Sequence, residues 1–551
     1  MATKQVFDGK TIIIPGVGSV IKSGIKNQPL NLGYGSVLII DTGSGASFGG
    51  GAGFAGELAS GKDETFYSFD NINDFRKFTH GGLWWLLADP LFKPGGAAVN
   101  GVSDITFIKA AETTAAEIAV SLDGDNDSSD SVSGTNGGTF TIQVKTEGLI
   151  GNGVLTTGSN LKYGYAFKME EGKNDSSKFI FSFYRGTFKG LDSNSLPYDG
   201  ITEELAIPEL LVQSKEVSTL TELVTWMTDD FTFNVYFKLK ESSVTGDGSI
   251  GTVDLDTYSA GYNLASGGTE NYTADVLSDV LESINDLYVQ FVLCDKYGSS
   301  AQHQYNSDIL SWSAINSKYK PEIYIGAQDT IAGFATSKVN SAFFDSDICT
   351  VVHGGIKKSI RTGSGFKNYP SIYKAAALLG REAGLAPQVP LTFKNIAIEG
   401  EQHSLTDKEV EQALEAGLLV TRLYDGEFEC VKGVNTLQEN DFIFNEDGTT
   451  HSKQAKRIAR QLNNELVINA RRQLLKQTNG VNKNTLSAAR LKSWTEAFLK
   501  TKIATPQNDN LIISYSNVIV TRVSDSWNVS YEFGVNGEVS FIFFTGTVID
   551  F

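Results

Sequence analysis

The chain has 551 residues, more than one compact core usually holds, which favours several domains. Its 46 basic and 64 acidic residues give a formal net charge of −18, which argues against a general binder of nucleic acid or of anionic membranes, because both would be repelled at long range. The 41% hydrophobic and 11% aromatic content suffices for folded cores, no apolar run reaches the roughly 20 residues of a membrane span, and the first residues lack the apolar stretch of a secretory signal.

The first predicted strand is a β-branched run over residues 11–14, which Pro15 and Gly16 close with a turn. No second strand lies next to it in the sequence, so it has no local partner. A further apolar strand is predicted over 36–41. The glycine-rich stretch that follows, residues 42–61, is too poor in apolar side chains to pack and predicts a loop.

Four short motifs match catalytic or metal-binding patterns only in part. The G-x-G-x-x-G at 51–56 begins ten residues after a strand ends, whereas a dinucleotide site needs its first glycine at the strand end. Residues 56–63 approach a P-loop, but Asp63 stands where a Ser or Thr must bind magnesium. The Asp-Thr-Gly at 41–43 has no second copy to complete an aspartic-protease pair. The alternating aspartates at 123–127 lack the turn glycine and the bidentate acid of a calcium loop, which leaves open only a weak, incidental cation site.

Cysteine and histidine usage gives no further site. The three cysteines and five histidines are scattered singly, without a C-x-x-C pair or an H-x-x-x-H spacing. Together with the incomplete motifs, this distribution predicts that the chain is not an enzyme and holds neither a cofactor nor a metal.

The middle of the chain is predicted to be β-rich. Residues 64–95 regain aromatic side chains and predict folded structure, whereas the acidic, Ser/Gly-rich tract 123–138 predicts a solvated loop or linker. From 139 to about 325, short strand-like runs alternate with Gly, Ser, Asp and Asn, which predicts one or two β-rich domains.

The last 225 residues alternate helical and strand-like patterns. A helix is predicted over 371–383, and Thr406-x-x-Glu409 is a capping box that opens another. Two longer helices near 452–477 and 485–502 precede the last predicted strands. These strands are 511–522, 527–533 and 538–549. The pattern predicts a mixed α/β region.

The two longer helices are strongly basic. Residues 453–502 carry twelve basic and two acidic side chains, a charge of +10 in a chain of −18. Four of the basic residues share one helix face by i, i+3, i+4 spacing, while Ile458, Leu462 and Leu466 line another. The basic face is either solvated or a contact surface for an acidic protein, which includes acidic patches on copies of the chain itself.

The two ends carry apolar strands. Residues 539–549 form a long, uncharged and aromatic run that stops two residues before the end of the sequence. It is either the last strand of the chain's own sheet, or it adds, as residues 11–17 could, to a sheet in a neighbouring copy. Strand exchange of that kind is head-to-tail, so it builds rings or helical filaments.

Taken in order, these features resemble the contractile tail sheath proteins of bacteriophages. The resemblance covers roughly residues 1–95 and 325–551, and the middle third matches no family that we can name. Its motifs are Pro15-Gly16-Val17, Arg381-Glu382 with Gly384, Pro387 and Pro390, Leu405-Thr406-Asp407, Glu415-Ala416-Gly417, Trp527-Asn528-Val529-Ser530-Tyr531, and Ile542-Phe543-Phe544-x-Gly546-Thr547.

The resemblance implies a structural function without an active site. Sheath subunits form six-membered rings that stack in a helix around a tail tube and are linked by terminal arms. From a metastable extended state, a trigger at the baseplate lets them repack and drive the tube through the host envelope to deliver the genome. It further implies assembly in the host cytoplasm, a place in the virion tail, and tube, baseplate and tail terminator proteins as partners, with no nucleic acid bound and no membrane insertion.

Carried onto this chain, the resemblance implies an α+β multidomain fold whose C-terminal α/β domain is completed by strands from neighbours. The expected units are a 1–20 arm, a discontinuous sheath domain of 21–100 plus 325–442, β-rich inserted outer domains over 101–324, an inner domain over 443–535 and a 536–551 arm. The expected inter-subunit arm strands contain Ile12, Ile13, Ile14, Val539, Phe541, Phe543, Thr545 and Thr547. The expected tube-facing basic residues are Lys453, Lys456, Arg457, Arg460, Arg471 and Arg472.

One alternative stays open. A β-rich phage adhesin or fibre, or a carbohydrate-binding structural protein, would use aromatic residues such as Trp226, Tyr258 and Tyr262. It explains the middle third but neither the basic helices nor the apolar ends. The sequence also does not separate a phage tail from another contractile injection machine.

Overall fold

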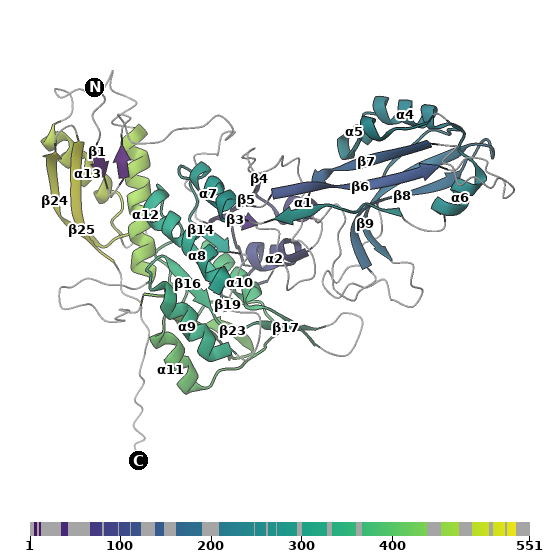
Figure 1. Cartoon of the computed structure of the whole chain (residues 1–551). Coiled ribbons are helices and arrows are strands. Elements are labelled where there is room, and N and C mark those ends of the chain that lie inside the picture. Colours follow the sequence, from purple (N-terminus) through teal and green to yellow (C-terminus); the bar gives the residue numbers. More distant parts are fainter. Residues whose placement is uncertain are drawn as a thin grey trace, which may run out of the picture.

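A computed structural model of the chain shows three units, a central α/β unit, an elongated β-rich unit and a smaller C-terminal unit (Figure 1). The structure describes residues 5–7, 10–12, 35–41, 67–79, 82–96, 99–110, 112–122, 138–147, 161–189, 209–246, 248–259, 263–271, 273–294, 300–327, 333–359, 366–437, 453–472, 487–505, 511–523 and 526–535. None of the described helices has the length and apolarity that a membrane span requires.

The central unit is built on a seven-stranded sheet in which every strand but one is parallel. Its strands, in spatial order, are β21 (Leu418–Leu419), β16 (Cys349–Val352), β15 (Glu322–Gly326), β14 (Phe291–Cys294), β3 (Ser36–Asp41), β5 (Asp104–Lys109) and the antiparallel β4 (Tyr67–Phe69). Runs such as SVLIID and CTVV are buried along their whole length, because both faces of a parallel sheet are covered.

Helices cover both faces of this sheet. One face packs against α1 (Ile72–Thr79), α2 (Gly82–Phe92) and α10 (Ser371–Ala383). The other packs against α7 (Ala274–Ser283), α8 (Ser300–Ser311), the π-helical η3 (Trp312–Asn316), α9 (Phe334–Phe344) and α11 (Asp407–Glu415). The predicted helix over 371–383 and the predicted capping box before α11 are confirmed.

Helix α10 is buried on almost every side, and glycines let it approach its neighbours closely. A Cβ on Gly380 would lie 2.5 Å from the Pro90 carbonyl oxygen, and one on Gly384 would lie 1.9 Å from the Asn100 carbonyl oxygen. These two positions therefore require glycine for steric reasons.

Two small antiparallel sheets complete the central unit. One has the order β18 (Phe366–Tyr369), β17 (Ile356–Ser359), β20 (Gly400–Glu401). The other has the order β19 (Asn395–Ile396), β23 (Glu427–Cys430), β22 (Thr421–Tyr424).

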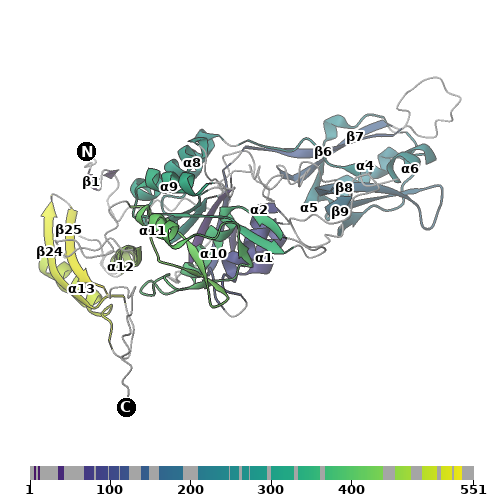
Figure 2. The ribbon, with the colours of Figure 1, turned by 90° about the horizontal axis from the view of Figure 1, so that it is seen from below.

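The β-rich unit contains two four-stranded sheets with a shared aromatic core. The first sheet consists of β10 (Glu209–Gln213), β9 (Phe179–Lys189), β8 (Leu161–Glu171) and β12 (Asn263–Leu264). The second consists of β11 (Phe237–Leu239), β7 (Gly138–Glu147), β6 (Glu112–Leu122) and β13 (Thr269–Asn271). Its helices are α4 (Leu220–Asp229), α5 (Phe233–Tyr236), η2 (Glu241–Ser243) and α6 (Thr252–Ser259). The unit projects from the central one in both views (Figures 1 and 2).

The inserted unit is shorter than the 101–324 expected from the sequence, since it spans residues 112–271. Strands β5 and β14, which the expectation placed in the insert, flank β3 in the central sheet, and β15 lies beside β14. Short, fully apolar strands look alike in a sandwich and in a buried parallel sheet, so the sequence did not locate the boundary.

The C-terminal unit contains α12 (Lys453–Ala470), α13 (Ala488–Lys500) and an antiparallel pair of β24 (Ser514–Val523) and β25 (Ser526–Gly534). Near the start of the chain, β1 (Gln5–Phe7) pairs with β2 (Lys10–Ile12). The predicted first strand coincides with the structure at residues 11 and 12, and the rest of it lies outside the described residues. The expectation that it has no local partner is wrong, because residues 5–7 form a strand that pairs with it.

Candidate functional site

Helix α12 joins the C-terminal unit to the central unit and has a different chemical character on each side. Ile458 and Leu462 are fully buried with Leu499 of α13 in the core of the C-terminal unit. The opposite side presents Lys453 and Arg457 to the central unit, where both are buried. One face of the helix is therefore held by apolar packing and the other by ionic and polar contacts.

A buried group of charges forms the contact of α12 with the central sheet, and we call it the α12 ion cluster: Glu322, Thr350, Glu382, Lys453 and Arg460. The Lys453 ammonium pairs with Glu322, lies 3.1 Å from Glu382 Oε2 and donates to Thr350 Oγ1 at 2.8 Å. Arg460 Nη2 lies 2.5 Å from Glu322 Oε2, and the Thr350 hydroxyl donates to Glu322 at 2.8 Å. Glu322 comes from β15, Glu382 from α10 and Thr350 from β16, so the cluster ties α12 to three elements at once.

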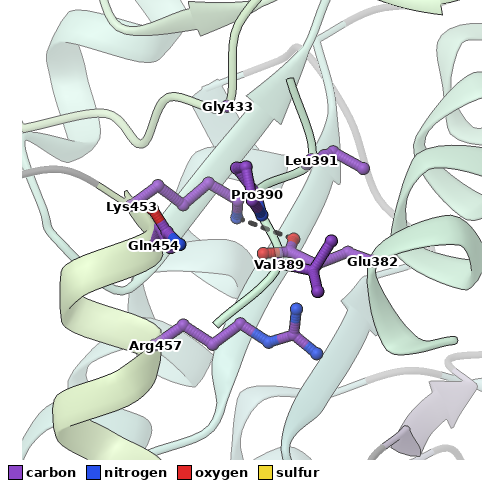
Figure 3. Close-up of a pocket in the computed structure, with 8 residues that line it drawn as sticks. All are labelled: Glu382, Val389, Pro390, Leu391, Gly433, Lys453, Gln454 and Arg457. Atoms are coloured by element: carbon purple, nitrogen blue, oxygen red, sulfur yellow. Dashed lines mark ion pairs between the residues drawn. The ribbon is translucent and has the colours of Figure 1, made fainter. Parts of the chain in front are cut away.

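Further polar contacts extend the cluster along the helix. Arg457 Nη2 donates to the Leu385 carbonyl oxygen at 2.6 Å, and Gln454 donates to the Gln388 carbonyl oxygen. Figure 3 shows the pocket between α12 and α10, with the ion pair of Lys453 and Glu382 beside Arg457. The polar side chains that line this pocket bond to one another and to the backbone. The pocket is therefore part of the contact between α12 and the central unit.

The electrostatics of the cluster follow from its burial. Burial raises the pKa of Glu382, an effect that the neighbouring Arg457 opposes. Burial, with the nearby Arg460 and Arg457, lowers the pKa of Lys453. Burying either charge alone would cost free energy, and the pairing of Lys453 with Glu382 offsets that cost. The contact therefore fixes how α12 is oriented and positioned on the central unit.

The structure changes the expectation for the basic helix. Lys453 and Arg457 face inward, and the Arg460 side chain is only 15% exposed, so these three do not form an outward basic face. Lys456 is partly exposed and pairs with Asp347 at 3.1 Å. Lys453 and Arg460 do share one face of the helix, as the i, i+3, i+4 spacing predicts. That face, however, contacts Glu322 and Glu382 of the same chain. A tube contact by Lys456, Arg471 or Arg472 stays a prediction.

The acidic half of the cluster was missed by sequence reasoning, although one signal was present. Glu382 lies in the small-residue helix 371–383, whose other charged residues are Lys374 and Arg381, and Glu322 opens an apolar strand. A carboxylate in such a setting needs a buried cationic partner, and the basic helix offers one.

The second feature of the C-terminal unit is a sheet with open edges. Strands β24 and β25 pair with each other from Ser514 with Gly534 to Val523 with Ser526, and within the described part of the chain neither pairs with a third strand. One face packs on the unit's core through the buried Val518, whereas Ile519 and Val523 are each 54% exposed. Two-stranded sheets are marginally stable alone, and among the residues that the structure describes both outer edges of this one lack a partner strand.

The expected arm strands have only a partial description. Ile12 ends β2. The other expected arm residues, Ile13, Ile14, Val539, Phe541, Phe543, Thr545 and Thr547, lie outside the described residues.

The aromatic residues of the adhesin alternative belong to the core of the inserted unit. Trp226 is 9% exposed and stacks on Phe183, with ring centroids 6.2 Å apart. The Tyr258 ring contacts Phe167, and its hydroxyl donates to the Ser121 carbonyl oxygen at 2.9 Å. Tyr262 lies outside the described residues. Trp226 and Tyr258 therefore do not form an exposed aromatic surface on which a sugar could stack.

A histidine pair lies beneath α9. His353 Nδ1 is 2.9 Å from Ser337 Oγ, and His353 Nε2 is 3.4 Å from His403 Nδ1. Burial lowers the pKa of His353 to about 3, so the ring is neutral at physiological pH. Among the residues described, no cluster of His, Cys, Asp or Glu has the arrangement of a metal site.

Comparisons with known proteins point to one class. No family model matches the chain. The tail sheath protein of Bacillus phage SP01 is 23% identical over 393 residues, which cover 70% of this chain and 61% of that protein. The alignment thus spans less than two thirds of that relative's length.

Solved structures give the same class of name. The sheath tail protein from Desulfitobacterium hafniense aligns with a TM-score of 0.52 at 13% identity, covering 94% of this chain and all of that one. The sheath tail protein from Listeria innocua aligns with a TM-score of 0.48 at 15% identity, covering 91% of this chain and 94% of that one. The resemblance to tail sheath proteins is confirmed by the phage relative, and the fold agrees with that of the Desulfitobacterium hafniense protein. Neither of these two proteins is named as an enzyme.

Proposed function

We propose that the chain is a structural subunit of a contractile tail sheath. Copies stack as six-membered rings around a tail tube, and contraction from a metastable extended state drives the tube through the host envelope to deliver the genome. The subunit performs no chemistry and needs no cofactor, because the work comes from free energy stored in the packing of the lattice. Assembly takes place in the host cytoplasm, and the product is part of the virion tail.

The open-edged sheet β24–β25 is the observation that carries this proposal. It offers two strand edges on a small unit, and the sequence supplies uncharged strand-like segments at 11–17 and 539–549. Strands that enter from neighbouring copies satisfy the edge backbone groups and cover exposed apolar side chains such as Ile519. Each copy would both give and accept strands, which is the head-to-tail arrangement of a helical lattice.

The charge distribution supports an outward position for the inserted unit. Residues 112–271 contain 10 basic and 24 acidic side chains, a net charge of −14, whereas the rest of the chain has 36 and 40, a net charge of −4. Repulsion between the acidic inserted units of neighbouring copies is smallest when these units point away from the lattice into solvent. The units that assemble would then be the central and C-terminal ones.

Contacts with other tail proteins follow from this arrangement. The tube is the proposed partner of Lys456 on α12 and of Arg471 and Arg472 directly after that helix. The baseplate and terminator proteins are the proposed partners at the two ends of the sheath. Charge reversal of Arg471 and Arg472 should weaken co-assembly with purified tube while the subunit remains folded. Unchanged co-assembly would exclude this part of the proposal.

Electron microscopy of the purified chain tests the proposal. We expect hollow, striated tubes from the wild type, and no tubes from the chain with Phe541→Lys and Phe543→Lys or from the chain without residues 538–551. A control with Ser493→Lys and Ala497→Lys adds the same charge on an exposed helix face of α13 and should still form tubes. Tubes from the truncated chain would refute the arm proposal, and discrete particles from the wild type at every concentration would refute the sheath.

A further inference from the structure

The polarity of helix α9 is inverted with respect to an ordinary surface helix. Its buried positions are Ser337, Asn340 and Ser341, with Phe344 at its last turn as the buried apolar residue. By contrast, Val339 is 66% exposed and Phe343 is 56% exposed. A surface helix normally turns its apolar stripe inward and its polar residues to water.

The buried polar side chains of α9 have partners in the central unit, which fixes this orientation. Ser337 bonds to His353, and Asn340 Nδ2 donates to the Ala327 carbonyl oxygen at 3.0 Å. A rotation of the helix that buried Val339 and Phe343 would break these bonds and leave buried polar groups unsatisfied. The apolar outer face is therefore built into the fold.

The outer face contains no charged residue. It consists of Ala335, Thr336, Val339, Ala342 and Phe343. The single charge of the helix is on Lys338, which donates to Gln412 of α11 at 3.3 Å and lies over the Phe334 ring, along the flank. Depletion of charge and exposed aromatic or aliphatic anchors are marks of the centre of a protein interface.

We propose that a second copy of this chain covers the outer face of α9 when the protein assembles. Copies repel each other mainly through the inserted unit, which carries −14 of the −18 charge and lies away from α9 in both views (Figures 1 and 2). Contact between copies is less opposed on the rest of the chain, which carries a net charge of only −4, and an uncharged apolar helix face on the central unit meets a neighbour without like-charge repulsion. The identity of the occupant rests on the proposed function, whereas the exposed face does not.

A thiol introduced at the centre of the face tests this proposal in the full chain. The native cysteines Cys294, Cys349 and Cys430 are all buried, so Val339→Cys provides a reactive thiol with little background. We expect a maleimide to react rapidly with it in dilute protein, and about tenfold more slowly after assembly, because labelling then requires the minority of uncovered copies. Phe231→Cys is the matched control, since Phe231 is 84% exposed in the inserted unit and should react equally fast in both states.

A charge on the same face gives a second measurement. Phe343→Glu should raise the protein concentration needed for assembly by about tenfold or more, with an unchanged circular dichroism spectrum. Phe231→Glu should leave that concentration unchanged. The size of the assemblies is measured by sedimentation velocity over a range of concentrations.

The outcomes separate this proposal from the sheath proposal. Tubes in which the introduced thiol stays fully reactive would overturn the α9 interface and leave the sheath standing. Association into particles other than tubes, with the thiol protected, would support the interface and refute the sheath. A chain that stays monomeric at every concentration would refute both, as judged from its sedimentation.

Discussion

Two lysines of α12, three residues apart, allow a quantitative test of the α12 ion cluster. One is buried in the cluster and the other belongs to a surface ion pair. Lys453→Met removes a buried cation that faces both Glu322 and Glu382, which are 0% and 2% exposed. Breaking a buried pair in this way typically costs about 3–5 kcal/mol, and we expect the lower end because Arg460 still pairs with Glu322. Lys456→Met is the control.

The control lysine belongs to a surface pair. Lys456 and Asp347 have side chains 29% and 39% exposed, and such pairs contribute about 0–1 kcal/mol. The assay is hydrogen exchange of α12 amides followed by mass spectrometry, since unfolding of a chain with several units is not one two-state transition. We expect faster exchange across α12 in Lys453→Met and little change in the control.

A second variant separates lost charge pairing from lost packing. If an uncompensated carboxylate causes the effect, adding Glu382→Gln to Lys453→Met should restore part of the protection. Equal exchange of α12 in Lys453→Met and Lys456→Met would refute the assignment of the cluster as the ionic contact that holds this helix.

Three further predictions concern the other units. The pKa of His353 is about 3 when folded and about 6.5 when unfolded, so the unfolded chain binds more protons between these values and the stability of the central unit should fall by about 2 kcal/mol from pH 7.5 to 5. His353→Gln should lack that part of the loss, as measured by hydrogen exchange of central-unit amides at the two pH values. Gly384→Ala should destabilise the central unit by about 1–3 kcal/mol in thermal unfolding because a backbone oxygen occupies the Cβ position, while Gly433→Ala, whose Cβ would make ordinary contacts, should not. Phe183→Ala should cost the inserted unit about 3–5 kcal/mol, and Phe231→Ala less than about 0.5 kcal/mol; equal effects in differential scanning calorimetry would contradict the assigned core.

Local signals in the sequence predicted individual elements well. The helix 371–383 begins and ends at the predicted residues, and Thr406 and Glu409 form the predicted capping box. Both features depend on residues that are neighbours along the chain, where spacing and capping chemistry decide the structure. The central parallel sheet was not predicted as such, because β3 and β14 pair across about 250 residues of intervening sequence.

The candidate site was predictable only in part, for the same reason. Helical spacing identified the basic face of α12, but the sequence does not say what that face meets. Glu322 and Glu382 come from other elements of the central unit, so their pairing with Lys453 appears only when the units are docked. The resemblance implied a C-terminal domain completed by strands from neighbours, which stays a prediction. That β24 and β25 pair with no third strand among the described residues is visible only in the fold.

The two sides of α12 should respond differently when the central and C-terminal units are displaced relative to each other. This difference indicates which contact should break first. Apolar contacts around Ile458 and Leu462 tolerate small shifts, because burial of apolar surface is not directional. The ion cluster depends on direction, so a shift that breaks it exposes its charges to water and lowers the cost of their separation. We therefore expect a rotation between the central and C-terminal units to occur at the cluster, with the core of the C-terminal unit left intact. In the proposed sheath, a lattice rearrangement that kept the arm strands joined would need such a joint, and α12 is the element that spans it.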